Sequence, residues 1–223
     1  MPLDRAERAQ LVSAAQAIGV SLDDHGVELC GLYLELLEFW SRRINLVGEA
    51  TREAWIARHI VDSMAATPLL RSLSASQPPS IADLGSGAGL PGVPLAIALR
   101  PARVVLVEPR RKRAHFLRAI KRELAGLAIE ILPSRIEDLE AERTRSLDAV
   151  VTRAAVATGD LLAAASRLLR PGGLAIRYAG RSVLQTGSEL ALATPRFTAA
   201  ETHRYQVPSC PEGALMVFRM RST

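Results

Sequence analysis

The residues with the clearest potential for chemistry form a glycine-rich run, Asp83-Leu84-Gly85-Ser86-Gly87-Ala88-Gly89-Leu90-Pro91-Gly92. Four glycines within eight residues allow the chain to turn sharply and allow a ligand to touch bare backbone. The run follows an apolar segment at 81–84 that is predicted to be a strand, and open α/β sheets bind ligands at the carboxyl ends of their strands. We therefore expect the loop around Gly87 to bind a cofactor.

Further chemically useful residues come directly after later predicted strands. Glu108 ends the apolar stretch 104–107, where its carboxylate can accept both hydroxyls of a ribose. Ile136 can cover an adenine ring, and Glu137 either orients polar groups around that ring or opens a helix in the acidic run 137–140. Arg153 emerges from the apolar segment 147–152, and a charge at that edge of a sheet usually faces the site.

Two cofactors fit the glycine loop. The spacing Gly87-x-Gly89-x-x-Gly92 matches the dinucleotide-binding pattern, and Glu108 lies 21 residues after Gly87, near the place of a ribose-binding acid. Asp83 favours S-adenosylmethionine instead, because a carboxylate there can meet the ammonium of an amino acid but would repel a pyrophosphate. A nucleotide-triphosphate loop is excluded because no Gly-Lys-Ser or Gly-Lys-Thr follows the glycines. We predict S-adenosylmethionine as the cofactor.

The elements that must position these residues divide into two parts. Residues 1–76 are predicted to form an N-terminal helical extension, with helices at 4–19, 23–46 and 51–64 and a cap at Asp23 or Asp24. Residues 77–223 are predicted to form the S-adenosylmethionine-binding domain, in which strands alternate with helices and imply a parallel sheet. The predicted strands are 81–84, 104–107, 127–132, 147–152 and 174–178, and the predicted helices are 93–99, 110–125 and 159–169.

The last part of the chain, from residue 196 on, does not show the alternation of strands and helices. Residues 196–207 and 214–220 are predicted to be extended and to pair as an antiparallel hairpin, because the six residues between them are too few for a crossover helix. Such a hairpin is typical of class I methyltransferases and unusual in dinucleotide-binding folds. The expected fold class is therefore α/β, a class I S-adenosylmethionine-dependent methyltransferase with a Rossmann-like seven-stranded sheet, an antiparallel last strand and an N-terminal helical extension.

Composition limits the remaining possibilities. A chain of 223 residues with 48% hydrophobic and 23% charged residues is neither disordered, collagenous nor a coiled coil. We expect no membrane span, because charges interrupt every long apolar stretch, and no secretory signal at the charged N-terminus. Cys30 and Cys210 match no metal-ligand spacing and no disulfide framework, which favours a reduced, cytoplasmic setting without a metal site.

The excess of positive charge is local. Residues 100–122 contain nine basic residues and a single acidic one, Glu108. The helix predicted there turns its apolar residues to the core and the stripe Arg111, His115, Arg118 and Arg122 to the other side. This stripe either binds RNA phosphates or is an ordinary solvated helix face. Aromatic residues make up only 4% of the chain, so base-stacking platforms are not expected.

With these residues placed, the chain resembles the RsmG (GidB) family of bacterial small-subunit rRNA guanine-N7 methyltransferases. The segments that carry the resemblance are Asn45-Leu46, Arg58-His59-Ile60-Val61-Asp62-Ser63, Asp83 through Pro94, Phe116-Leu117, Ser134-Arg135-Ile136-Glu137 and Arg153-Ala154. The resemblance implies that Gly85, Leu90, Ile136, Glu137 and Arg153 contact the methyl donor. It also implies a guanine in the 530 loop of 16S rRNA (position 527) as the target, the small ribosomal subunit as partner, a cytoplasmic location and a monomer.

The chain departs from the family pattern at one position, and one of the shared segments allows two interpretations. Family members often carry a lysine-glycine pair after the fifth strand, where this chain has Tyr178-Ala179-Gly180, so Arg177 or Arg181 would have to supply the charge. Arg58 and His59 could form a site wall or meet RNA phosphate. The structural alternative, which we favour for His59, is a contact with Asp62 on its own helix.

The chemistry expected for guanine N7 is simple. This atom has an in-plane lone pair and no proton, so in-line methyl transfer needs orientation but no general base. The sequence is consistent with N7 as the target. No Asn-Pro-Pro-Tyr-like tetrad, which positions exocyclic amines, follows the fourth strand, and neither cysteine lies in a nucleophile motif of the kind that cytosine-C5 enzymes need. The alternatives are a methyltransferase for small molecules or protein, a nicotinamide-dependent oxidoreductase, and a nucleotide- or RNA-binding module without catalysis.

Overall fold

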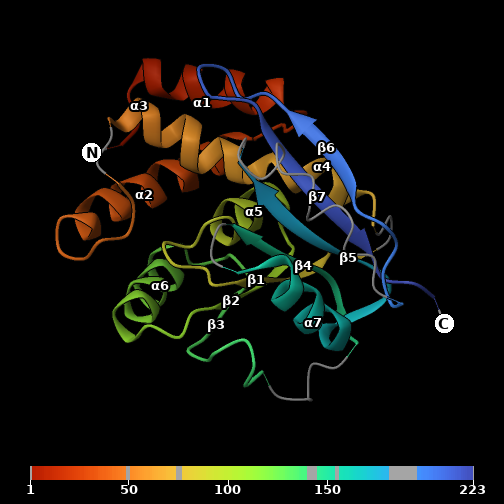
Figure 1. Cartoon of the computed structure of the whole chain (residues 1–223). Coiled ribbons are helices and arrows are strands. Elements are labelled where there is room, and N and C mark those ends of the chain that lie inside the picture. The colour runs from red at the N-terminus through yellow and green to blue at the C-terminus, as the bar shows by residue number, and fades with distance from the viewer. Residues whose placement is uncertain are drawn as a thin grey trace.

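Seven strands form one sheet in the computed structural model, which describes residues 2–48, 51–73, 77–139, 145–153, 156–180 and 195–222. The strands are β1 (Ser80–Leu84), β2 (Arg103–Val107), β3 (Ile129–Leu132), β4 (Leu147–Arg153), β5 (Leu169–Ala179), β6 (Glu201–Tyr205) and β7 (Gly213–Arg219). Their order is β3-β2-β1-β4-β5-β7-β6. Strands β1 to β5 pair in parallel, whereas β7 runs antiparallel to both β5 and β6 (Figure 1). The predicted fold class, including the closing antiparallel hairpin, is confirmed.

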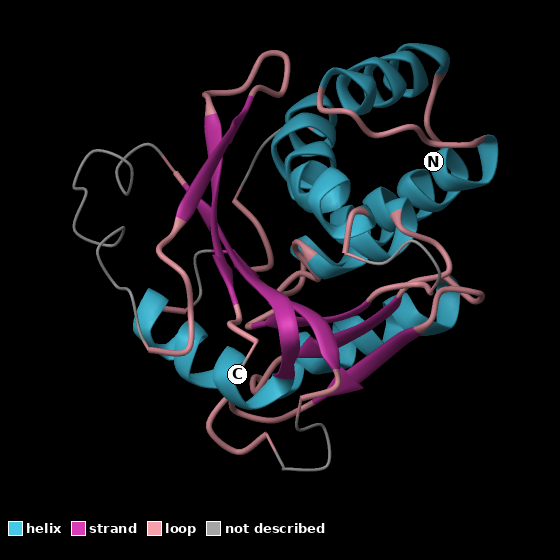
Figure 2. Ribbon diagram, turned by 90° about the vertical axis from the view of Figure 1, so that its right-hand side faces the viewer, coloured by secondary structure: helices cyan, strands magenta, loops and turns pink. Residues whose placement is uncertain are grey.

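Helices cover both faces of the sheet. The described elements are α1 (Arg5–Ala17), α2 (Asp24–Ser41), α3 (Arg52–Trp55), η1 (Ile56–Val61), η2 (Met64–Ala66), α4 (Thr67–Arg71), α5 (Gly92–Ala98), α6 (Arg111–Glu123) and α7 (Thr158–Leu168). Figure 2 shows the N-terminal helices gathered on one side of the twisted sheet. Alternate residues of a strand point to opposite faces, so Ile81 packs with the N-terminal helices, α5 and α6, while Ala82 packs with α7. None of the described helices is long and apolar enough to cross a membrane.

The N-terminal helices share a hydrophobic core with the sheet. Tyr33 and Leu37 of α2 are fully buried in the same cluster as Ile81, Leu106 and Phe116. The ring of Trp40 packs edge-on against Phe116, with 5.8 Å between the centroids. The boundary expected between residues 76 and 77 borders residues 74–76, which lie outside the described residues. The division into two domains stays a prediction, and the helices on its N-terminal side pack on the sheet through apolar contacts.

Two boundaries differ markedly from the sequence-based predictions. Asp23 is the N-cap of α2, as expected, and its Oδ1 accepts a hydrogen bond from the Gly26 N–H, but the helix ends at Ser41 instead of 46. There the N–H groups of residues 43 and 44 both donate to the Trp40 carbonyl and turn the chain. Strand β5 begins at Leu169 instead of 174. The Pro-Gly-Gly segment predicted as a turn lies within it, where the register against β4 is irregular and the two glycines exchange hydrogen bonds with Met220, the residue after β7.

The third predicted helix is interrupted. In place of one α-helix over 51–64, α3 spans one turn and is followed by the π-helix η1 and the 3₁₀ turn η2. The buried residues of η1 are Ile56, Ala57, Ile60 and Val61, and their spacings of three and four also fit an α-helix, so the apolar pattern does not reveal the π-helix. Single π-helical turns inside helices often occur at functional sites, because they change where side chains and carbonyl groups point.

Candidate active site

The carboxyl ends of the central strands meet around a cavity of about 1010 Å³. All seven residues predicted to bind the cofactor line it: Gly85, Gly87, Leu90, Glu108, Ile136, Glu137 and Arg153. The loop after β1, the residues after β2 and β3, and the last residue of β4 therefore converge, as expected for this edge of an open α/β sheet. The structure brings these residues together, and their role in binding the cofactor stays a prediction. The N-terminal part of the chain adds Leu46, Val47 and His59 to the lining.

The glycine loop is held in a conformation that requires glycine. Gly85, Gly87 and Gly89 have φ values of +73°, +56° and +85°, in the left-handed region that other residues rarely adopt. At Gly92 the reason is packing, since a Cβ atom would lie 2.3 Å from Cδ2 of Leu106. The N–H groups of Gly85 and Ser86 donate to the Val107 carbonyl at 2.9 and 3.0 Å, which fixes the loop on the end of β2.

The carboxylate of Glu108 is hydrogen-bonded to the glycine loop. It is 2% exposed, its Oε2 accepts a hydrogen bond from the Gly87 N–H and its Oε1 accepts one from the Arg110 N–H, both at 2.8 Å. Each carboxylate oxygen has two acceptor positions, so one on each oxygen is left for a pair of ligand hydroxyl groups. The site thus fits the ribose of a nucleoside cofactor.

Asp83 does not lie where we expected it. The expectation that its carboxylate meets the ammonium group of the cofactor is wrong, because Asp83 is fully buried and is not part of the cavity lining. Its Oδ2 accepts a hydrogen bond from the Gly92 N–H at 3.0 Å, beneath the loop. Its Oδ1 has no hydrogen-bond partner among the described residues. Burial raises the pKa of Asp83 to about 7.

Ile136 and Glu137 form the end of the cavity beyond β3. Their carbonyl groups accept hydrogen bonds from the Arg167 guanidinium of α7, at 3.1 Å for Ile136 and 3.4 Å for Glu137. The described residues after them form a turn, in which the Asp138 N–H donates to the Arg135 carbonyl, so up to residue 139 no helix begins at Glu137. This arrangement favours the site alternative for Glu137 over the helix-start alternative.

Arg153 closes the opposite end of the cavity and is held by the interrupted helix. Its guanidinium donates to the Ser63 Oγ at 3.1 Å and to the Arg58 carbonyl at 2.8 Å, and it lies 3.3 Å from the Asp62 Oδ2. Asp62 also accepts a hydrogen bond from the Tyr205 hydroxyl on β6, at 2.7 Å. The sequence analysis missed Tyr205, which is 143 residues from Asp62.

His59 belongs to the cavity wall. The contact that we favoured, between His59 and Asp62, is not made, because Asp62 pairs with Arg153 and Tyr205 instead. Burial, with a smaller contribution from the Arg153 charge, lowers the pKa of His59 to about 4, so the imidazole is neutral at physiological pH. Its Nδ1 is buried without a partner in the part of the chain that the structure describes.

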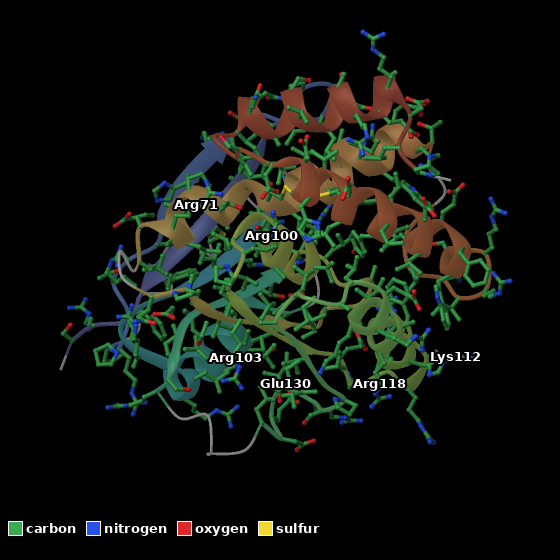
Figure 3. The ribbon with its side chains drawn as sticks, turned by 180° about the vertical axis from the view of Figure 1, so that it is seen from behind. Arg71, Arg100, Arg103, Lys112, Arg118 and Glu130 are labelled. Atoms are coloured by element: carbon green, nitrogen blue, oxygen red, sulfur yellow. The ribbon has the colours of Figure 1, made fainter. Side chains whose placement is uncertain are left out.

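Two other expectations concern basic residues outside the cavity wall. Arg177 donates to the Thr158 hydroxyl of α7 at 2.6 Å and does not line the cavity, and Arg181 lies outside the described residues. On α6 the predicted stripe is exposed, and the Lys112 and Arg118 side chains extend away from the sheet (Figure 3). Leu117, Ile120 and Leu124 are fully buried on the other side, as predicted.

The strand order, the glycine loop and the acid after β2 together define a class I S-adenosylmethionine-dependent methyltransferase. Solved structures with the same fold include a methyltransferase from Geobacter sulfurreducens (20% identity, TM-score 0.55, covering 84% of this chain and 88% of that one). Another is the 1,6-didemethyltoxoflavin-N1-methyltransferase of Burkholderia thailandensis with bound S-adenosylhomocysteine (16% identity, TM-score 0.55, covering 85% and 88%). At these identities the likeness concerns the fold.

Sequence comparison identifies the family. The GidB family model, rRNA small subunit methyltransferase G, matches residues 27–217. The Ribosomal RNA small subunit methyltransferase G of Xanthomonas oryzae pv. oryzae is 34% identical over 209 residues, covering 92% of this chain and 93% of the relative. That of Polynucleobacter asymbioticus is 34% identical over 164 residues, 74% of each chain. The chain belongs to the GidB family, and S-adenosylmethionine, the cofactor that the sequence predicted, is the methyl donor of this family and fold.

Proposed function

We propose that this protein methylates N7 of a guanine in 16S rRNA, the guanine at position 527 in the 530 loop, with S-adenosylmethionine as the donor. The observation that carries the proposal is the convergence of seven cofactor-binding candidates around one cavity in a chain of the GidB family. The family assignment supports a small-subunit rRNA substrate. The choice of guanine N7 rests on the resemblance noted in the sequence and on the chemistry of the site.

Six of the seven candidate residues have distinct places in binding the donor. Glu108 accepts the ribose hydroxyls, Ile136 covers the adenine and Glu137 orients polar groups around it. The loop from Gly85 to Leu90 receives the methionine part against its backbone. When bound, S-adenosylmethionine supplies an electrophilic methyl group on a sulfonium. Arg153, the seventh candidate, is held by three acceptors at the end of the cavity where the acceptor base would enter, so we place it against the base and not against the donor.

The catalytic demand on the protein is mainly orientation. Guanine N7 attacks through its lone pair without losing a proton, so the residues of this chain need to align nucleophile, methyl group and sulfur, which can supply roughly 7–11 kcal/mol of barrier reduction. His59, the histidine of the cavity wall, is neutral, and the proposed reaction assigns it no proton transfer. No general base is assigned.

The basic surface supports an RNA substrate. Four arginines line the cavity, namely Arg110, Arg113, Arg135 and Arg153, against the two acids Glu108 and Glu137. The exposed stripe of α6 extends this positive charge along the surface next to Arg110 and Arg113. Such residues hold phosphates and orient the RNA without reading its sequence. We further propose that the enzyme acts as a monomer in the cytoplasm, on 16S rRNA or the small ribosomal subunit.

The test is transfer of labelled methyl groups from S-adenosylmethionine. Purified protein is incubated with small ribosomal subunits and with deproteinised 16S rRNA from cells that lack the modification, and the modified base is mapped by cleavage at 7-methylguanine. Label at one guanine of the 530 loop is the expected result. Label only in small molecules or protein, or no transfer to either RNA substrate, would reject the proposal.

A further inference from the structure

The wall of the cavity that carries Leu46, Val47 and His59 contains none of the residues that we propose to hold the donor. Strands β3, β2, β1 and β4 are neighbours in that order, so Ile136, Glu108, the glycine loop and Arg153 follow one another along the edge. If the proposed function is correct, the donor lies along this edge with its adenine at Ile136 and its ribose at Glu108. Its methionine part, and with it the reactive methyl group, then points toward Arg153 and the residues beside it.

The residues beside Arg153 come from the chain before the sheet. Leu46 and Val47 present apolar side chains and His59 an imidazole, and all three line the cavity. The segment carrying Leu46 is tied to α6, because Arg113 donates to the Asn45 carbonyl at 3.3 Å. The volume of about 1010 Å³ lies at the upper end of the roughly 300–1,000 Å³ usual for ligand pockets, so there is room for a second ring system beside a nucleoside.

His59 is the polar group of this wall that still needs a partner. Its Nδ1 is buried without a hydrogen-bond partner among the described residues, and the side chain lines the cavity, so Nε2 is the ring nitrogen left to meet a ligand. Burial, with a smaller contribution from the neighbouring Arg153 charge, lowers the pKa of His59 and keeps the ring neutral. A neutral imidazole nitrogen can accept a hydrogen bond as well as donate one. A ligand in the cavity can reach this ring, which makes His59 a candidate contact for the base.

We propose that His59 is a substrate-binding residue that accepts a hydrogen bond, through Nε2, from the Watson–Crick edge of the target guanine, while Leu46 and Val47 cover the face of the base. Guanine N7 must face the methyl group, so the N1–H and the amino group of the base point away from the donor and need acceptors. Adenine has no hydrogen at N1, so His59 favours guanine when its Nε2 lies opposite N1 of the base. The base would have to leave its stack in the RNA to enter this site.

The experiment compares three variants of the full chain with the wild type. His59→Leu removes the polar edge at similar size, His59→Gln keeps a polar group near Nε2, and His25→Leu replaces an exposed histidine of α2 as a matched control. Methyl transfer to small ribosomal subunits gives kcat and KM for RNA, and calorimetry gives Kd for S-adenosylmethionine. We expect His59→Leu to lower kcat/KM for RNA about ten-fold, the size of one lost hydrogen bond, with Kd for the donor within two-fold of wild type.

We expect His59→Gln to stay within three-fold of wild type in kcat/KM and His25→Leu to be unchanged. The inference is overturned if His59→Leu keeps kcat/KM within two-fold, or if its affinity for the donor falls by the same factor as kcat/KM. If His59→Leu shows no cooperative thermal unfolding, His59→Asn replaces it, and full activity of that shorter side chain would likewise overturn the inference. Wild-type protein that transfers no methyl group to RNA would instead reject the proposed function, and this inference with it.

Discussion

The two walls of the cavity are built in different ways. The donor wall consists of the loop from Gly85 to Gly92 and of Glu108, which are joined to each other and to the end of β2 by short hydrogen bonds to backbone groups. The opposite wall consists of side chains, in which Arg153 of β4 is held by the interrupted helix and, through Asp62, by Tyr205 of β6. Local backbone geometry therefore fixes the first wall, whereas the second exists only when three distant segments pack together.

The largest effect on stability and donor binding is expected when a methyl group is added at Gly92 in the donor wall. In Gly92→Ala the new Cβ would lie 2.3 Å from the Leu106 Cδ2 and 2.8 Å from the Asp83 Oδ2, so these buried side chains or the loop must shift. We expect the free energy of unfolding to fall by about 2–4 kcal/mol and donor binding to be lost, measured by denaturant titration and calorimetry. Gly159→Ala is the matched control, because a Cβ there meets nothing within 4 Å. Equal stability of the two variants would show that the loop is not fixed as described.

The buried carboxyl under the loop should give the donor wall a pH dependence. Burial raises the pKa of Asp83 to about 7 from the ordinary 3.8, so the folded protein keeps a proton that the unfolded chain releases. Its contribution to stability is therefore complete below pH 4 and is lost as the pH rises to about 7, a change on the order of a few kcal/mol.

Asp83→Asn should flatten the slope of unfolding free energy against pH between 5 and 7, and Asp160→Asn, an exposed acid on α7, should not. The measurement is denaturant unfolding at several pH values. The same slope in wild type and Asp83→Asn would mean that Asp83 is already ionised in the folded protein.

Glu108→Gln tests the carboxylate of the donor wall. The amide oxygen can accept only one of the two backbone N–H groups that Glu108 binds, and its NH2 faces the other, while the charge that strengthens hydrogen bonds from ribose hydroxyls is lost, a difference of roughly 1.5–3 kcal/mol. We expect affinity for S-adenosylmethionine to fall about ten- to hundred-fold by calorimetry and the free energy of unfolding to fall by about 1–3 kcal/mol, the cost of one unpaired N–H. Glu123→Gln, at the exposed end of α6, is the control. Unchanged affinity would remove Glu108 from the site.

The smallest effect is expected in the other wall. Tyr205→Phe removes the hydrogen bond to the Asp62 Oδ1, worth about 1 kcal/mol, and loosens the partner of Arg153. We expect a fall of a few-fold in kcat/KM for RNA while affinity for S-adenosylmethionine stays the same. His203→Leu, a neighbour on β6 outside this network, should change neither quantity. A loss of donor affinity in Tyr205→Phe would show that the two walls are not separable.

The donor wall was largely predictable from the sequence because its geometry is local. A strand followed by glycines and an acid at the end of the next strand are short-range patterns, and they placed Gly85, Gly87 and Glu108 at the cavity. Asp83 was the exception. Strand alternation puts it on the same face as Ile81, beneath α5, and that alternation was the signal that could have corrected its position.

The other wall was not predictable in the same way. The string Arg58 to Ser63 was noticed only through the family resemblance, and the spacing of its apolar residues does not reveal a π-helix. The pairs that give it a role, Arg153 with Asp62 and Asp62 with Tyr205, join residues far apart in the chain. No local pattern encodes such pairs, since they depend on how the β6–β7 hairpin and the N-terminal helices pack on the rest of the sheet.

The Tyr33 hydroxyl of α2 donates a hydrogen bond to the Ala88 carbonyl in the glycine loop, at 2.7 Å. This bond couples the loop to a helix that lies outside the cavity. A molecule that binds the loop more tightly while α2 is docked must, by reciprocity, hold α2 in its docked position by the same factor. Binding of such a molecule in the pocket would then slow the exchange of the α2 amide hydrogens with water. The exchange rate of α2 would report whether the pocket is occupied.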